Sequence, residues 1–184
     1  MNKNITNTIN LLNRYKPKDI RENVYKEQML ELINTCENSF SRESKIGHFT
    51  ASCLLLNKNK THILLTHHRK LERWLQLGGH CDGDPDVMNV AMKESIEESG
   101  IEEIKPLSKD IFDIGIHLIP ANKKEEAHYH FDIRFLLHAY SNNNFKISEE
   151  SKDLKWVELN SKDTTELDES LSRMLKKLQY AEIA

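Results

Sequence analysis

Apolar residues recur along the chain at two spacings, which predict helices near both ends and strands between them. Before about residue 45 they recur at helical intervals in two runs, 7–15 and one that opens at Lys18, with Pro17 between them. From Gly47 onward the pattern changes to short apolar or alternating runs that are typical of strands, at 49–56, 62–66 and 112–119. A final run, 165–181, has the spacing of an amphipathic helix.

The clearest strand covers residues 128–138, where apolar and polar residues alternate with a period of two. One face is apolar, and the other carries His128, His130, Asp132, Arg134 and His138. Three interpretations of this polar face stay open: a polar surface or internal hydrogen-bond network, one wall of a substrate cleft, and a second metal site. The third is included because two histidines at positions i and i+2 can bind a transition metal.

Strands that are interspersed with two helices, one in the middle of the chain and one at its end, favour a layered α/β domain. A chain of 184 residues suits one such domain with an appendage. We therefore predict an N-terminal helical extension over residues 1–45 and a main domain over residues 46–184. The extension is expected to pack on the main domain. The alternative is a dimerisation or substrate-covering element, so a homodimer is left open.

Charge and composition argue against several partners. The net charge of −3 gives no overall basic field for nucleic acid or a membrane surface. No window approaches the roughly 18 apolar residues of a spanning helix, and no signal segment is apparent. Cys36, Cys53 and Cys81 are scattered and odd in number, which indicates a reduced, cytoplasmic protein. Cys81 follows His80, but the backbone role of this loop explains the position better than a thiol nucleophile or zinc ligand.

A glycine loop, residues 78–86, runs directly into a short acidic helix. Asp84 is predicted as the N-cap of this helix and Pro85 as its first residue. Gly100 can take the left-handed conformation that ends a helix, so the helix is expected to stop just before it. The loop and helix together are the stretch in which we expect the chemistry of the protein.

Three glutamates, Glu94, Glu97 and Glu98, fall within one arc of roughly 100° on this helix. Carboxylates at these spacings repel one another. A solvated helix face tolerates this repulsion, and a bound divalent cation removes it. Hard oxygen ligands that lie close together suit Mg²⁺ or Mn²⁺. From the spacing alone, an exposed acidic helix and a metal site are both open.

The loop and helix resemble the Nudix box, G-x5-E-x7-R-E-U-x-E-E-x-G-U, in which U is a bulky apolar residue. Gly79 matches the opening glycine, the three glutamates match the last three of the box, and Gly100-Ile101 matches its end. Pro85 stands where the first box glutamate belongs, Lys93 replaces the arginine, and Ser95 replaces an apolar residue. In the family, the glutamate and arginine that are missing here help to brace the loop against the helix.

The resemblance covers roughly residues 47–160 and implies a Nudix α/β/α sandwich with a mixed β-sheet. It also implies that Glu94, Glu97, Glu98 and the Gly78 carbonyl hold Mg²⁺ or Mn²⁺, with one glutamate acting as base. In related sequences a glutamate outside the box joins the metal site or acts as base. Glu150 is the candidate for this role, and Glu149 is the reserve.

The implied activity is hydrolysis of a phosphoanhydride bond in a nucleoside diphosphate linked to another moiety, so the expected partner is a small nucleotide-derived substrate. Candidate substrate ligands are Arg134, which could fork onto a phosphate oxygen, together with His130 and His80. A basic loop at 67–70 could also meet a phosphate, and a solvated loop is the alternative. The alternative function is a non-catalytic nucleotide- or ligand-binding module on the same scaffold, which the departures at Pro85 and Lys93 favour.

Overall fold

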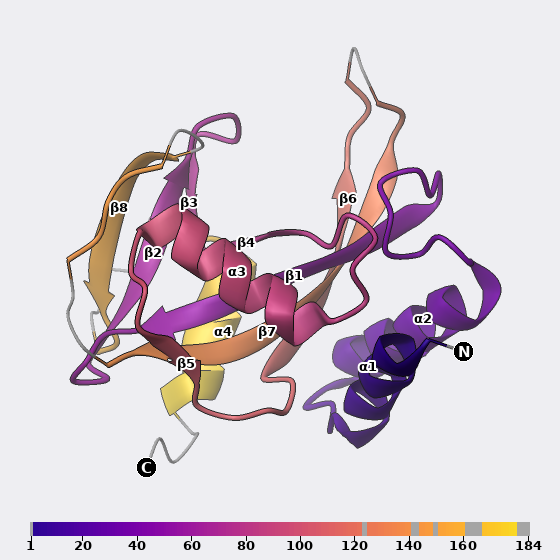
Figure 1. Cartoon of the computed structure of the whole chain (residues 1–184), viewed down its shortest axis with the longest axis horizontal. Helices are drawn as coiled ribbons and strands as arrows, with labels where there is room; N and C mark the ends of the chain where they lie inside the picture. The colour runs from indigo at the N-terminus through magenta and orange to yellow at the C-terminus, as the bar shows by residue number, and fades with distance from the viewer. Residues whose placement is uncertain (1, 123–124, 141–143, 149–150, 161–166, 180–184) are drawn as a thin grey trace. The chain divides into compact units, whose positions relative to one another are not determined.

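A computed structural model describes residues 2–122, 125–140, 144–148, 151–160 and 167–179 (Figure 1). Four helices and eight strands follow one another along the described chain. In order they are α1 (Lys3–Arg14), α2 (Ile20–Thr35), β1 (Gly47–Leu56), β2 (His62–His68), β3 (Arg73–Leu75), β4 (Leu77–His80), α3 (Val87–Ser99), β5 (Ile104–Pro106), β6 (Asp113–Ile119), β7 (His128–Ala139), β8 (Ser151–Glu158) and α4 (Glu169–Gln179). None of these helices is long and apolar enough to cross a membrane.

The strands belong to one sheet, in the order β3-β2-β1-β7-β5, with β4 paired to β1, β6 to β7 and β8 to β2. The chain divides into two compact units. Unit 1 comprises Met1–Ser52, Gly79–Ala91 and Ser108–Phe135, and unit 2 comprises Cys53–Gly78, Met92–Leu107 and Leu136–Ala184. The predicted boundary between residues 45 and 46 stays a prediction.

Unit 1 contains the two N-terminal helices, which pack side by side (Figure 1). Both begin at side-chain caps, since Asn2 accepts a hydrogen bond from the amide of Asn4 and Asp19 from that of Glu22. The Glu22 carboxylate is buried, and it accepts hydrogen bonds from the Tyr15 hydroxyl at 2.7 Å and the Lys18 amide at 2.8 Å. These bonds fix the turn around Pro17 that was predicted to separate the helices.

Unit 1 also contains the pairing of β6 with β7, which is antiparallel and sets the polar residues of the two strands opposite one another. Asp113 lies opposite Arg134, Gly115 opposite Asp132, and His117 opposite His130. In the middle of β7, both faces are buried, because Asp132 and Arg134 are as inaccessible as their apolar neighbours. The polar face of this strand is therefore buried at its centre, where Asp132 and Arg134 lie.

Unit 2 is built around β2, which pairs antiparallel with β1, β3 and β8. The turn between β1 and β2 begins at Asn57, whose side-chain oxygen accepts hydrogen bonds from the amides of Thr61 and His62. These bonds form the turn between the two strands predicted at 49–56 and 62–66. The closing helix α4 buries one stripe of apolar residues, as its spacing predicted: Leu171, Met174, Leu175 and Leu178.

Candidate active site

The acidic helix is α3, and it ends at Ser99, just before Gly100, as predicted. Gly100 has φ of 67°, and its amide donates a hydrogen bond to the Ile96 carbonyl at 2.8 Å. A residue with a Cβ adopts this left-handed conformation only with strain, so glycine is the suitable residue here. The helix therefore carries Glu94, Glu97 and Glu98 in its last two turns, as predicted.

The start of α3 lies two residues later than the sequence suggested, and the prediction of Asp84 and Pro85 as cap and first helical residue is wrong. Asp86 is the cap: its carboxylate accepts a hydrogen bond from the Asn89 amide at 3.2 Å, and its carbonyl accepts one from Val90 at 3.0 Å. Asp84 instead accepts a bond from the Asp86 amide at 2.9 Å, which forms a turn ahead of the helix. The turn leaves Pro85 outside the helix.

Within unit 2, Glu98 connects the acidic helix to the glycine loop. Glu98 is 7% exposed, and its carboxylate accepts a hydrogen bond from the Gly78 amide at 2.8 Å. This bond sets Gly78 and Glu98, two of the predicted metal ligands, next to each other.

The other two glutamates of the arc have different environments. Glu94 is half-buried, whereas Glu97 is exposed. Glu97 lies 3.7 Å from the Lys93 ammonium, a pair whose side chains are 58% and 65% exposed. An exposed pair of this kind contributes only about 0.3–0.5 kcal/mol. Lys93 therefore stabilises the helix face weakly, without the forked contacts that arginine can make.

This donor set fits a hard divalent cation. It consists of carboxylate oxygens within two helical turns, one of them buried and hydrogen-bonded to the backbone of the glycine loop. Oxygen ligands of this type suit Mg²⁺ and Mn²⁺. Glu150, the predicted additional ligand or base, and its reserve Glu149 lie outside the described residues.

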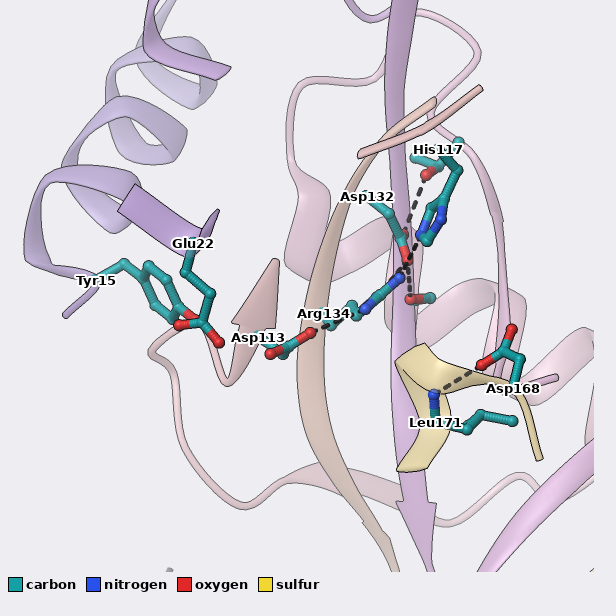
Figure 2. Close-up of polar contacts among 10 residues, drawn as sticks. Tyr15, Glu22, Asp113, His117, Asp132, Arg134, Asp168 and Leu171 are labelled. Atoms are coloured by element: carbon teal, nitrogen blue, oxygen red, sulfur yellow. Dashed lines mark hydrogen bonds and ion pairs between the residues drawn. The ribbon is translucent and has the colours of Figure 1, made fainter. Parts of the chain in front are cut away.

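Arg134 lies in a buried charge network of unit 1 (Figure 2). Its guanidinium donates to Asp132 at 2.7 Å and to Asp113 at 2.8 Å, and the side chains of Arg134 and Asp113 are 1% and 0% exposed. Although burial by itself lowers the pKa of Arg134, the charges and hydrogen bonds of Asp132 and Asp113 outweigh it and raise this pKa above its ordinary value. This geometry fits the internal network that the sequence left open, and it gives no support to Arg134 as a substrate ligand.

Neighbouring residues complete this network. The hydroxyls of Thr50 and Ser52, on β1, donate to Asp132 at 3.0 and 2.9 Å. The His117 ring contacts the guanidinium through Nε2, which must accept the bond because arginine can only donate. Gly115 leaves room for the guanidinium, since a Cβ at this position would lie 2.7 Å from Arg134 Nη2.

A second polar group in unit 1 consists of four histidines, His48, His80, His128 and His130, which we call the histidine cluster. The Nε2 atom of His130 lies 3.3 Å from that of His80 and 3.3 Å from that of His128. The centroid of the His48 ring lies 4.9 to 5.2 Å from the ring centroids of the other three histidines. The predicted substrate ligands His80 and His130 are thus together, with their ring nitrogens facing other imidazoles.

Burial is the main reason that three of these histidines, His48, His80 and His130, resist protonation. It lowers the pKa of His48 and His80 from 6.5 to about 4, and that of His130 to about 3, with repulsion from neighbouring histidines or Arg42 adding to the effect. All three imidazoles are therefore neutral at pH 7. Whether His80 and His130 contact a substrate stays a prediction.

Sequence reasoning identified His80, His128 and His130 but missed His48 as a member of this group. His48 lies on β1, whose residues are buried at every position, so no polar–apolar alternation marks one face of the strand. Sequence reasoning also missed Asp113 as the partner of Arg134. The alternation within residues 112–119 could have shown Asp113 and His117 on one face, but only strand pairing shows that this face meets β7.

The NUDIX domain model matches residues 47–178 of the sequence. The chain belongs to this family. Membership confirms the predicted fold class, the α/β/α type with a mixed sheet, and the predicted enzyme class, the Nudix pyrophosphohydrolases that act on acid anhydrides. No curated protein matches the sequence.

Solved structures similar to this chain share its fold at low identity. A C. elegans Ap4A hydrolase has a TM-score of 0.57 at 20% identity, covering 71% of this chain and 94% of that chain. A MutT Nudix hydrolase from Burkholderia pseudomallei has a TM-score of 0.56 at 19% identity, covering 72% and 98%. The E. coli dihydroneopterin triphosphate pyrophosphohydrolase has a TM-score of 0.53 at 14% identity, covering 74% and 96%.

Proposed function

We propose that this Nudix protein is a Mg²⁺- or Mn²⁺-dependent hydrolase that cleaves a phosphoanhydride bond in a nucleoside diphosphate linked to another moiety. The observation that supports this most strongly is the hydrogen bond between Glu98 and the Gly78 amide. It joins the acidic helix to the glycine loop at two positions proposed as metal ligands. The substitutions at Pro85 and Lys93 leave this contact in place.

In this proposal, Glu94, Glu97, Glu98 and the Gly78 carbonyl hold the cation. A cation held by these residues would supply Lewis-acid chemistry for phosphoanhydride hydrolysis and would activate water as the nucleophile. Glu98 has two tasks, because it supplies negative charge and fixes the backbone of Gly78. Glu97 is exposed, so its carboxylate would be accessible to a cation at this face of the helix. Glu150 remains our proposed additional ligand or base.

The family and the names of similar solved structures support the proposed substrate class. Two similar structures are of an Ap4A hydrolase and a dihydroneopterin triphosphate pyrophosphohydrolase, names that both describe phosphoanhydride compounds. We extend this class, but neither individual substrate, to the present chain. A small nucleotide-derived molecule also fits the net charge of −3, which provides no general attraction for nucleic acid.

The test is a substrate panel with matched variants. Purified protein is incubated with dinucleoside polyphosphates, nucleoside diphosphate sugars and dinucleotides in Mg²⁺, Mn²⁺ or EDTA, and products are separated by anion-exchange chromatography. Cleavage is expected only with metal. Glu98→Gln, which keeps an oxygen to accept from the Gly78 amide, should lower turnover at least about 100-fold, or about 2.7 kcal/mol of barrier. The control is Glu102→Gln, an exposed glutamate just beyond α3, which should keep wild-type turnover.

Two results would contradict the proposal. If Glu98→Gln cleaved every substrate at the wild-type rate, the metal assignment would be wrong. If the wild-type protein bound nucleotides but cleaved none of them with either metal, the chain would be the non-catalytic ligand-binding module.

A further inference from the structure

The histidine cluster brings imidazoles from three strands of unit 1 to one place. His48 comes from β1, His80 from the end of β4, and His128 and His130 from β7. One ring nitrogen each of His48, His128 and His130 lies within 4.8 Å of the other two. His80 joins this group through its contact with His130.

Hydrogen bonds among the imidazoles do not account for this arrangement. The His128 Nδ1 atom donates to the Glu126 carbonyl at 2.9 Å, because a carbonyl can only accept. In the neutral ring, His128 Nε2 therefore has no hydrogen and presents a lone pair to His130. The Nε2 atom of His130 faces both His80 and His128 but carries at most one hydrogen, so it can donate to only one of them.

His48 gives the strongest indication that the cluster binds a ligand. It is 2% exposed, and neither of its ring nitrogens has a hydrogen-bond partner in the structure. Buried polar atoms are nearly always paired, so two unpaired nitrogens on one buried ring point to a ligand. The three other rings of the cluster surround this imidazole.

We propose that the histidine cluster binds one divalent transition-metal ion of the zinc class, with His48, His128 and His130 as its core ligands and His80 as the fourth. Two nitrogen–nitrogen distances of the cluster fit this geometry, and the nitrogens of the three core ligands lie within 4.8 Å of one another. Zinc–nitrogen bonds of about 2.05 Å in a tetrahedron place neighbouring ligand nitrogens about 3.3 Å apart. The two closest nitrogen pairs of the cluster are 3.3 Å apart.

The chemistry of the site also selects this class of metal. Neutral imidazoles are good ligands for zinc, copper and nickel, whereas Mg²⁺ prefers hard oxygen donors. The bond from His128 Nδ1 to a backbone carbonyl is the outer contact that orients metal-bound histidines. Four protein ligands leave no open position, which is typical of a structural zinc site. The ligands and the metal preference of this site differ from those of the proposed glutamate site.

The first measurement is metal content. Tag-free full-length protein, loaded with Zn²⁺ and dialysed against excess Mg²⁺, should retain one zinc per chain by elemental analysis. Co²⁺ in place of Zn²⁺ should give the strong visible absorption of a tetrahedral site. His128→Gln should bind Zn²⁺ at least about 100-fold more weakly, because even loss of an outer contact weakens binding about 10–100-fold. His128 is half-buried, so this variant is better tolerated than one at His48.

Two control variants make the result specific. His138→Gln changes another histidine of β7, one that contacts the Lys58 carbonyl, and should keep wild-type zinc content. Glu98→Gln should also keep it, which separates this site from the proposed hydrolase site. The metal should raise the melting temperature of the wild type and of both controls, but not that of His128→Gln. The proposal is overturned if the wild-type protein retains no zinc, or if His128→Gln and His130→Gln bind it as tightly as the wild type does.

Discussion

Arg134→Ala removes the cation that two buried carboxylates share. Asp113 and Asp132 lie 2.8 and 2.7 Å from the guanidinium, in a part of unit 1 where neither carboxylate is open to water. Asp132 keeps the hydroxyls of Thr50 and Ser52 as donors, whereas Asp113 loses its ion pair. The variant therefore leaves buried negative charge with weaker compensation, and we expect it to destabilise the fold.

The size of the effect follows from the burial. Removing one partner of a buried ion pair costs about 3–5 kcal/mol of unfolding free energy. In a chain of this length, each kcal/mol lowers the melting temperature by about 2–4 °C, so the expected fall is about 6–20 °C. Arg134→Lys should recover only part of this loss, because an ammonium cannot bond both carboxylates in the forked geometry of arginine.

A matched control separates the buried setting from the loss of an arginine. Arg14 bonds Asp110 through two of its nitrogens, but both side chains are more than half exposed. Arg14→Ala should cost at most about 1 kcal/mol. Melting would be followed by circular dichroism, and the Michaelis constant would be measured with any substrate found in the panel. If Arg134→Ala melted like Arg14→Ala while its Michaelis constant rose, the guanidinium would bind substrate and the network interpretation would fail.

Other expectations concern the glycine loop and the helix that follows it. Asp86→Ala should lower the unfolding free energy by about 1 kcal/mol, because it removes the cap of α3, and Asp84→Ala should lower it by less. Denaturant unfolding would measure both, and a larger loss for Asp84→Ala would support Asp84 as the cap. Glu98→Ala should have an unfolding free energy about 1–3 kcal/mol below that of Glu98→Gln, since only alanine leaves the Gly78 amide without its acceptor. Equal stabilities of the two variants would show that this bond is weak. Gly115→Ala should cost about 1–3 kcal/mol by crowding the guanidinium, and an unchanged melting temperature would contradict this.

Local signals in the sequence were sufficient for most of the elements. Gly100 ends α3 because its left-handed conformation is a property of glycine itself, and Asn57 forms the turn before β2 through bonds within five residues. The alternation in β7 predicted a strand with a polar face for the same reason, since a period of two follows from the backbone alone. The glutamate arc could likewise be placed on one helix before any fold was known.

What the sequence could not supply was the partner of each polar residue. Arg134 and Asp113 are 21 residues apart, and only the register of β6 against β7 sets them opposite each other. The prediction of the start of α3 failed for a local reason, because aspartate is a good N-cap residue at either position 84 or position 86. The Asx turn at Asp84 decided between them. His48 carried no signal at all, since its strand is buried throughout.

The departure from the family motif at Pro85 is easier to understand once the N-terminal residues are considered. Within unit 1, the loop that leads into α3 is held by the extension: the buried Thr8 hydroxyl donates to the Pro85 carbonyl at 2.7 Å, and the Gly83 amide donates to the Phe40 carbonyl at 2.8 Å. The exposed pair of Arg42 and Asp82 adds at most about 1 kcal/mol. The first two bonds use backbone atoms of the loop, so they do not require a charged side chain at position 85. A loop fixed by its backbone can accommodate proline there, because proline keeps its carbonyl acceptor and loses only an amide donor that these contacts do not use.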